Sequence, residues 1–197
     1  MHTFLPDELT LGLIAGGRAS RLGGVDKAWL MRGGVPQVLR WTRRFPGEHG
    51  PVLVSANRDR ERYATHGLAV VADRHPDLGP IGGLDALAQV CATPWLLTLP
   101  VDLVGVNDCL VRTLVSARDA DGAFARDEDG VQPLVALWRV DALRTASAEA
   151  ISRGETAIHR LQATLRMAEV AFTGFRFGNL NTPDDLHAAG IDTESTT

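Results

Sequence analysis

The chain has 197 residues, and 45% of them are hydrophobic, which suffices for one α/β domain with its own core. No apolar run approaches the ~20 residues that span a bilayer, and the first residues lack the basic and apolar regions of a secretory signal, so we expect a cytoplasmic protein. The two cysteines have neither the spacing of metal ligands nor that of a disulfide scaffold, so we expect free thiols. The formal net charge of −4, without a basic run, argues against nucleic acid as the main partner.

Short apolar runs recur along the chain and predict strands. Each of the first four is too short for a helix and is bounded by Gly, Pro, Asn or Asp, so we expect strands that are buried on both faces. A later run with a proline at its start and a final mixed run predict two more. The six expected strands cover residues 11–14, 51–55, 68–71, 95–99, 132–138 and 167–172.

Helix-like stretches alternate with these strands. They cover residues 37–44, 58–63, 84–90, 108–118, 140–152 and 157–165. Strand–helix alternation predicts a three-layer α/β/α fold with a mostly parallel sheet and right-handed crossovers. We expect a single domain over residues 1–197, with a core from 10 to 190 and a polar tail from 191 to 197. Ligands of such sheets bind outside the carboxyl ends of the strands, so the residues just after each strand are the first site candidates.

The segment after the first strand, residues 14–27, carries two glycine pairs and three basic side chains, Arg18, Arg21 and Lys27. Paired glycines let the backbone approach a ligand closely, and successive N–H groups in such a turn form an anion-binding concavity. The loop therefore suits a triphosphate. It is neither a Walker loop nor a dinucleotide fingerprint, because no Gly-Lys-Ser/Thr follows and Arg18 stands where a second glycine would fall. The alternative is a surface turn with solvated arginines.

Lys27 is the single lysine among 20 basic residues, so the other 19 are arginine. A bias this strong points to coding composition, and it makes the exception informative. We interpret position 27 as a place where arginine will not serve.

Polar residues follow three of the expected strands. Asp102 ends the fourth strand, and its carboxylate is a hard oxygen ligand suited to Mg²⁺; the alternative is a turn cap. Asn57 and Asp73 follow the second and third strands. Together they offer acceptors and a donor for a base or a ribose, and the sequence leaves that choice open. Asn57 could instead cap a helix.

Two further segments combine glycine, proline and amide side chains. Residues 79–83, Gly-Pro-Ile-Gly-Gly, open a helix whose start could face a base or a phosphate, with a plain turn and cap as the alternative. In residues 179–185, Asn-Leu-Asn-Thr-Pro-Asp-Asp, a capping box around Thr182 explains the Thr, the Pro and Asp185. It does not explain Asn179 or Asn181, so at least one amide is a site candidate.

The glycine-rich segment resembles the signature of nucleotidyltransferases that make sugar nucleotides and cofactor dinucleotides. Its Gly-Gly-Val-Asp-Lys ending is most similar to that of the molybdenum cofactor guanylyltransferase family. Asn-x-Asn-Thr-Pro, Gln132-Pro133 and residues 79–83 extend the resemblance over about residues 11–188. The chain departs from the family pattern at Ile14, at Leu22 and after Asp102, where Leu103-Val104 replaces the usual Thr-Pro or Met-Pro.

The resemblance implies a Rossmann-like three-layer α/β/α nucleotidyltransferase domain and a magnesium cofactor held by Asp102. Catalytic roles would fall to Lys27, Arg21 and Asp102. Nucleotide or cofactor contacts would fall to Ile14, Ala15, Gly16, Gly17, Lys27, Asn57, Asp73, Gly82, Asn179 and Asn181.

The implied reaction transfers GMP from GTP to the terminal phosphate of molybdopterin and releases pyrophosphate. That phosphate is already largely dianionic near neutrality, so no general base is required, and catalysis would rest on positioning and charge neutralisation. The resemblance also implies transient contact with molybdoenzymes or cofactor-delivery proteins. Three alternatives stay open: a molybdenum cofactor cytidylyltransferase, a sugar-1-phosphate nucleotidyltransferase, and a non-catalytic carrier of GTP or pterin.

Overall fold

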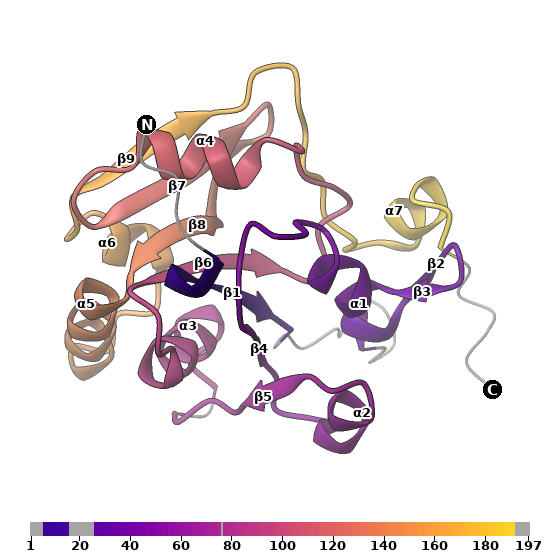
Figure 1. Ribbon diagram of the computed structural model, residues 1–197, viewed down its shortest axis with the longest axis horizontal. Coiled ribbons are helices and arrows are strands. Elements are labelled where there is room, and N and C mark those ends of the chain that lie inside the picture. Colours follow the sequence, from indigo (N-terminus) through magenta and orange to yellow (C-terminus); the bar gives the residue numbers. More distant parts are fainter. Residues whose placement is uncertain (1–5, 16–25, 76, 192–197) are drawn as a thin grey trace.

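A seven-stranded sheet runs through the centre of the computed structural model, which describes residues 6–15, 26–75 and 77–191 (Figure 1). Its strand order is β5-β4-β1-β6-β8-β7-β9. All neighbours are parallel except that β8 runs antiparallel to β6 and to β7. The bounds are β1 Leu9–Ile14, β4 Val52–Ser55, β5 Ala69–Val71, β6 Trp95–Pro100, β7 Gly122–Asp127, β8 Gly130–Arg139 and β9 Met167–Ala171.

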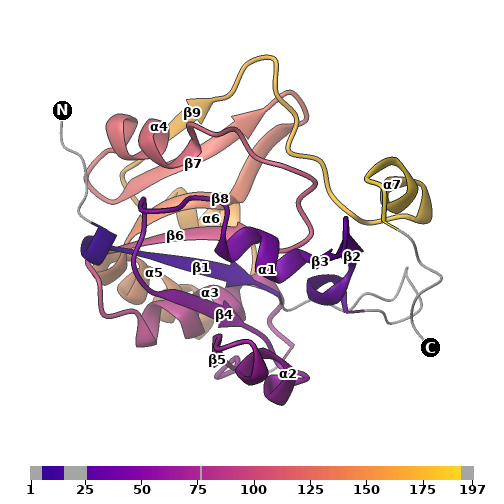
Figure 2. The ribbon, with the colours of Figure 1, turned by 45° about the vertical axis from the view of Figure 1, so that its right-hand side comes forward.

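Helices cover both faces of this sheet, so the expected three-layer, mostly parallel α/β/α fold is confirmed (Figure 2). One face packs against side chains of α1 (Gln37–Thr42), α2 (Arg60–Thr65) and α4 (Leu110–Ala117). The other face packs against α3 (Pro80–Val90), α5 (Val140–Ser152) and α6 (Ile158–Gln162). A last helix, α7 (Pro183–Ala188), packs on Leu30 instead of on the sheet.

The two cores follow the alternation of side chains along the central strands. On β6, Leu97 and Leu99 enter the core under α1 and α4, whereas Leu96 enters the core under α3 and α5. On β8, Leu137 enters the core under α1 and α4, and Trp138 enters the core under α3 and α5. Because successive residues of a strand point to opposite faces, a continuous apolar run is what a strand covered on both sides requires.

Some expectations about single elements are wrong. The strand expected at 68–71 is the edge strand β5, which is partly exposed, because an edge strand has a neighbour on one side only. The sequence also gave no signal for β7, whose residues mix Gly, Arg and Asp, or for the hairpin of β2 (Met31–Arg32) and β3 (Val35–Pro36). Two short 3₁₀ turns, η1 (Pro6–Glu8) and η3 (Lys27–Trp29), were likewise not expected.

Other expectations hold. Cys91 and Cys109 are free thiols. The capping box at the start of α7 is present, with Thr182 accepting from the Asp185 amide and Asp185 accepting from the Thr182 amide. Over the described ranges, the longest apolar helices fall short of what a membrane crossing needs.

Candidate functional site

Four parallel strands end at one edge of the sheet, and the candidate residues follow those ends. Asp73 follows β5, Asn57 follows β4, Ala15 follows β1 and Asp102 follows β6. The loop backbones are joined there, since the Ala15 amide donates to the Ser55 carbonyl at 2.9 Å. Parallel pairing therefore places residues from four remote segments along one rim.

Lys27 is the point where three remote segments meet. Its Nζ donates to Asp102 Oδ2 at 2.9 Å and to Asn181 Oδ1 at 2.6 Å. The Lys27 and Asp102 side chains are 19% and 24% exposed, so the pair is shielded from solvent but still reachable by a ligand. A lysine, a carboxylate and an amide at one point form a polar centre that can receive a phosphate and a cation.

The turn that carries Lys27 is anchored on both sides. Asp26 caps η3 by accepting a hydrogen bond from the Ala28 amide at 2.9 Å. Burial raises the pKa of the Asp26 carboxyl, and this hydrogen bond opposes the rise. The Trp29 and Tyr63 rings pack at a tilt, with their centroids 4.8 Å apart, and the Arg62 guanidinium carbon lies 4.2 Å from the centroid of the same indole. These contacts hold the backbone of Lys27 on α2.

The segment of Asn179 and Asn181 lies beside the loop of Asp102. The Leu180 amide donates to the Asp102 carbonyl at 2.7 Å, and Asn179 bridges Leu103 through the backbone. The Asp185 carboxylate accepts hydrogen bonds from the backbone N–H groups of Asn181 and Thr182. The Thr182 side chain and those two amides hold the pKa of Asp185 below its usual value. The capping box thus also orients Asn181 toward Lys27.

The residues at this centre fit a magnesium ion that has one protein ligand. Lys27 occupies Asp102 Oδ2, and no group of the described ranges bonds to Oδ1. Those ranges also hold no group of three His, Cys, Asp or Glu side chains that could enclose a metal. Mg²⁺ commonly takes one or two carboxylates and completes its shell with substrate phosphates and water.

Asn57 and Asp73 form an interlocked pair on the other side of β1. Asn57 Nδ2 donates to Asp73 Oδ2 at 2.9 Å, and the Asp73 amide donates to Asn57 Oδ1 at 2.9 Å. Ser55 Oγ approaches Asp73 Oδ1 at 3.4 Å. Asn57 does not cap α2, because Asp59 is the capping residue. Its amide is engaged within the protein, so Asp73 presents the carboxylate and Asn57 fixes it.

Gly82 and Gly83 let α3 lie close behind this pair. A Cβ at Gly82 would stand 3.3 Å from Asp73 Oδ2, and a Cβ at Gly83 would stand 2.5 Å from Ser55 Oγ. Both glycines are buried in the first turn of α3, and Gly79, with φ of 67°, precedes it. Because these two residues lack a Cβ, α3 can lie close to the side chains of Ser55 and Asp73 at the strand ends.

The structure thus brings the sequence-predicted residues into two groups: Lys27, Asp102 and Asn181 in one, Asn57, Asp73 and Gly82 in the other. Ala15 lies between them, whereas the Ile14 side chain enters the core and the Ile14 carbonyl accepts from the Val101 amide at 3.1 Å. The candidates Gly16, Gly17, Arg18 and Arg21 lie outside the described residues.

Sequence reasoning missed the supporting residues. Asp26 was read only as part of a motif, although an Asp before a short turn is a capping signal. Gln132, which belongs to the Gln132-Pro133 part of the family resemblance, donates to Asp127 at 3.0 Å and is engaged within the fold. No local pattern in the sequence signals that pairing.

Comparison with known proteins places these residues in a family context. The model of the MobA-like NTP transferase domain matches residues 12–169. Molybdenum cofactor guanylyltransferase of Cupriavidus necator is 37% identical over 190 residues, which cover 91% of this chain and 95% of that protein. The Serratia proteamaculans protein of the same name is 32% identical, with 91% and 92% covered.

Solved structures share the fold at lower identity. Molybdopterin-guanine dinucleotide biosynthesis protein A from Archaeoglobus fulgidus superposes with a TM-score of 0.66 at 21% identity, over 92% of this chain and 96% of that one. A putative glucose-1-phosphate thymidylyltransferase from Bacillus anthracis gives 0.73 at 11% identity, over 92% and 94%. At these identities the likeness concerns the architecture alone.

Proposed function

We propose, since this chain belongs to the MobA-like NTP transferase family, that it transfers GMP from GTP to the terminal phosphate of molybdopterin and releases pyrophosphate. The relatives at 31–37% identity over about nine-tenths of the chain support this assignment. The observation that carries it is the centre where Lys27 Nζ contacts both Asp102 and Asn181. The two unpaired thiols and the nucleotide donor fit a cytoplasmic site of action.

Lys27 supplies positive charge where the reaction needs it. An oxygen of the pterin phosphate attacks the α-phosphorus of GTP; the new O–P bond forms as the bond to the β-phosphate oxygen breaks, and pyrophosphate leaves with that electron pair. Negative charge builds on the phosphoryl oxygens during this step. An ammonium held between a carboxylate and an amide needs little reorganisation to stabilise that charge.

Asp102 and Asn181 position the centre. Asp102 Oδ1 would hold magnesium, which when bound supplies a second cation to neutralise and orient the phosphates. Asn181 keeps Lys27 Nζ directed toward Asp102. In the second group, Asp73 offers acceptors to a base or a ribose, and Asn57 holds that carboxylate still. No side chain is required as a general base, because the attacking phosphate is already ionised.

A magnesium titration of Asp102→Asn tests the metal assignment. The amide is nearly isosteric but brings no negative charge to a hard cation, so we expect turnover at ordinary magnesium levels to be lost while the fold persists. Steady-state rates against magnesium concentration, with circular dichroism, measure both. Near-normal turnover of the variant at those levels would make Asp102 a turn residue only.

A pyrophosphate-release assay tests the function. Purified protein receives GTP, CTP, ATP or UTP with magnesium, each with molybdopterin, with a sugar 1-phosphate, or with no acceptor. We expect release that depends on molybdopterin and is highest with GTP. Preference for CTP would assign a cytidylyltransferase, acceptance of a sugar phosphate instead of molybdopterin would assign a sugar nucleotide enzyme, and binding without release would assign a carrier.

A further inference from the structure

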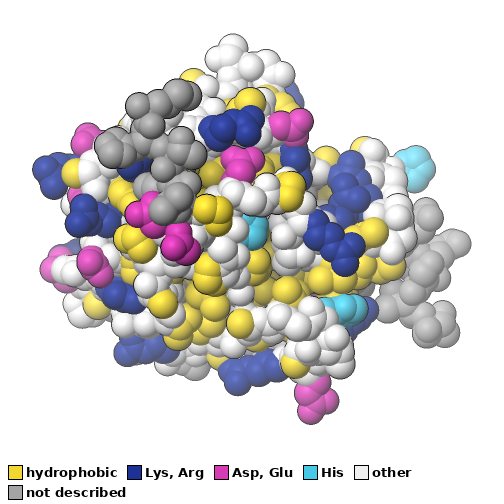
Figure 3. Space-filling model, in the orientation of Figure 1, with side chains coloured by type: hydrophobic (Ala, Val, Ile, Leu, Met, Phe, Trp, Pro, Cys, Tyr) yellow, Lys and Arg dark blue, Asp and Glu magenta, His cyan; other side chains and the backbone are white. Residues whose placement is uncertain are grey.

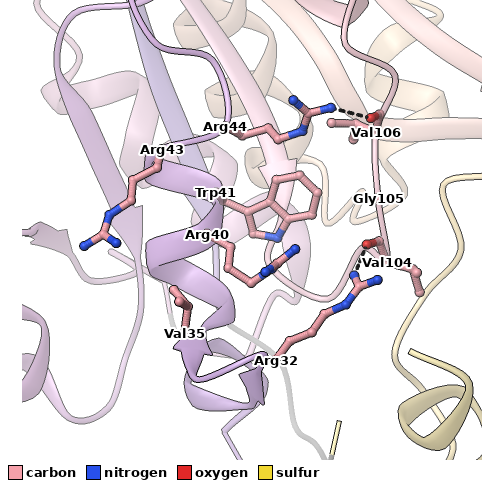
Figure 4. Close-up of a pocket in the computed structure, with 9 residues that line it drawn as sticks. All are labelled: Arg32, Val35, Arg40, Trp41, Arg43, Arg44, Val104, Gly105 and Val106. Atoms are coloured by element: carbon pink, nitrogen blue, oxygen red, sulfur yellow. Dashed lines mark hydrogen bonds between the residues drawn. The ribbon is translucent and has the colours of Figure 1, made fainter. Parts of the chain in front are cut away.

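A pocket of about 450 Å³ opens between α1 and the loop after Asp102, and arginines dominate its wall (Figure 4). Its volume lies within the range of small-molecule sites. Neither Lys27 nor Asp102 lines it, so it is separate from the proposed active centre. Its lining residues are Arg32, Val35, Arg40, Trp41, Arg43, Arg44, Val104, Gly105 and Val106.

The arginines of this pocket carry more positive charge than the fold neutralises. Arg44 pairs with Asp108, but within the described ranges no carboxylate pairs with Arg32, Arg40 or Arg43. Burial, and then the positive charge of Arg40, lower the pKa of the Arg32 guanidinium. On the face drawn in Figure 3, basic side chains likewise gather toward the right-hand side without acidic neighbours. Like charges held together in a hollow favour an anion.

Two of these arginines are already fixed in place. Arg32 Nη1 donates to the Val104 carbonyl at 2.6 Å, and Arg44 Nη2 donates to the Val106 carbonyl at 3.0 Å. Each guanidinium has five N–H donors, so further donors remain for a ligand. In Figure 4, Arg40 extends from α1 toward the fixed Arg32, whereas Arg43 points away from the loop. Because these two guanidinium groups are already held in place, binding of a ligand would cost less side-chain conformational entropy.

We propose that this arginine pocket is a second phosphate site, which binds the oxyanion of a small phosphorylated molecule separately from the Lys27–Asp102 centre. Planar guanidinium forks match the oxygens of a phosphate in pairs. Arg32 and Arg40 converge on one small hollow instead of spreading over a surface, which suits one oxyanion better than an extended acidic peptide. The ligand's remaining atoms would lie against Val35, Trp41 and Val104.

Trp41 gives this site its own reporter. Its indole Nε1 donates to the Val101 carbonyl at 3.1 Å and its ring lines the pocket, whereas Trp29 lies two residues from Lys27. The chain has four tryptophans, so their ¹⁵N-indole NMR signals can be assigned by single Trp→Phe variants. Metal-free titrations at constant ionic strength with inorganic phosphate, pyrophosphate and GTP then report on both places. The ligand that shifts the Trp41 signal at the lowest concentration identifies the source of the phosphate.

We expect pyrophosphate to shift the Trp41 signal saturably and Arg40→Gln to weaken that binding about tenfold or more, because a charge-assisted hydrogen bond is lost. Arg40 is exposed and unpaired within the described ranges, so the variant should fold; Arg40→Lys, which keeps the charge, should recover part of the affinity. Arg160→Gln removes one positive charge from α6 and should change nothing. No saturable shift, or equal weakening by Arg40→Gln and Arg160→Gln, overturns the site; tighter binding of an oligoglutamate peptide overturns the small-molecule assignment.

Discussion

Lys27 holds its position by two contacts that leave little room for a larger head group. Its Nζ lies 2.9 Å from Asp102 and 2.6 Å from Asn181. A lysine presents a compact ammonium, whereas an arginine presents a wide, planar fork. We therefore propose a geometric reason for this single lysine in an arginine-rich chain, namely that a guanidinium at the same place would push Asp102 or Asn181 aside.

Lys27→Arg should lower kcat/KM on the order of a hundredfold, since a displacement of about 1 Å in a positioned centre has that effect. Steady-state kinetics give the value, and circular dichroism confirms folding. The matched control is Arg153→Lys on α5, which exchanges the same two residue types in an exposed pair with Glu149 and should leave turnover unchanged. Wild-type turnover of Lys27→Arg would make the lysine accidental.

Both ends of the Asn57 amide are bonded to Asp73, so we expect Asn57 to act on a bound nucleotide through that residue. Asn57→Ala should raise KM for GTP about tenfold with a smaller change in kcat, since a mobile carboxylate binds more weakly. Ser55→Ala, which removes the weaker 3.4 Å contact to Asp73, should have a smaller effect in the same assay. Equal effects of the two variants would refute the positioning role.

At the level of elements, Asp127 ties the β7–β8 hairpin to the loop before α7. Its carboxylate is buried, at 7% exposure, and accepts hydrogen bonds from Asp129, Gln132 and Phe177. Burial alone would raise the pKa of Asp127, but the donors, led by the Phe177 amide, outweigh it and lower the pKa. The ionised form is therefore the one the fold stabilises.

Asp127→Asn should lower the free energy of unfolding by about 2–4 kcal/mol at pH 7, because the amide cannot accept from all three donors. A carboxyl with a lowered folded-state pKa contributes stability above its unfolded pKa of about 3.8 and loses it as the pH falls through the folded value. The difference in free energy of unfolding between wild type and variant should thus be largest at neutral pH and should disappear below about pH 4. Urea unfolding at several pH values measures it.

Asp141→Asn supplies the control for that experiment. Asp141 lies on α5 with its side chain 84% exposed, and within the described part of the chain its carboxylate pairs only with Arg144. Its substitution should change stability by less than about 0.5 kcal/mol across the same pH range. A pH-independent loss in Asp127→Asn would show that packing, not ionisation, is what that residue contributes.

For the whole molecule, the proposed site exists only when the chain is folded, because residues 27, 102 and 181 meet through tertiary contacts. A ligand that binds the folded state alone stabilises it by mass action. GTP with magnesium, at about 100 times its dissociation constant, should therefore raise the free energy of unfolding by about 2.7 kcal/mol. Thermal unfolding followed by circular dichroism gives the shift.

CTP at the same concentration should raise stability less than GTP. A site that pairs the donors of guanine leaves buried polar groups unpaired with the wrong base, and such a mismatch discriminates strongly. Asp73, held by Asn57, is the acceptor that we propose for the base or the ribose of the nucleotide. Equal or larger stabilisation by CTP would contradict the guanylyl assignment.

The sequence by itself determined the layered fold and the candidate residues. Apolar runs predicted four interior strands, β4, β1, β6 and β8, and both edge strands, β5 and β9, since a run of apolar residues is a local signature of a buried strand. The interior strand β7 was missed because its polar residues do not leave that signature. Motifs likewise pointed to Lys27, Asp102 and Asn181 one by one.

Only the tertiary structure decided how these residues meet. Strand order and register decide that Lys27 bridges Asp102 and Asn181 and that Asn57 bonds to Asp73. The packing of α1 against the loop after Asp102 decides that Arg32 and Arg40 line one pocket. Lys27 lies 75 residues from Asp102 and 154 residues from Asn181 along the chain, and local periodicity carries no information about such contacts. These segments lie together because the loops that follow parallel strands all begin at the same edge of the sheet.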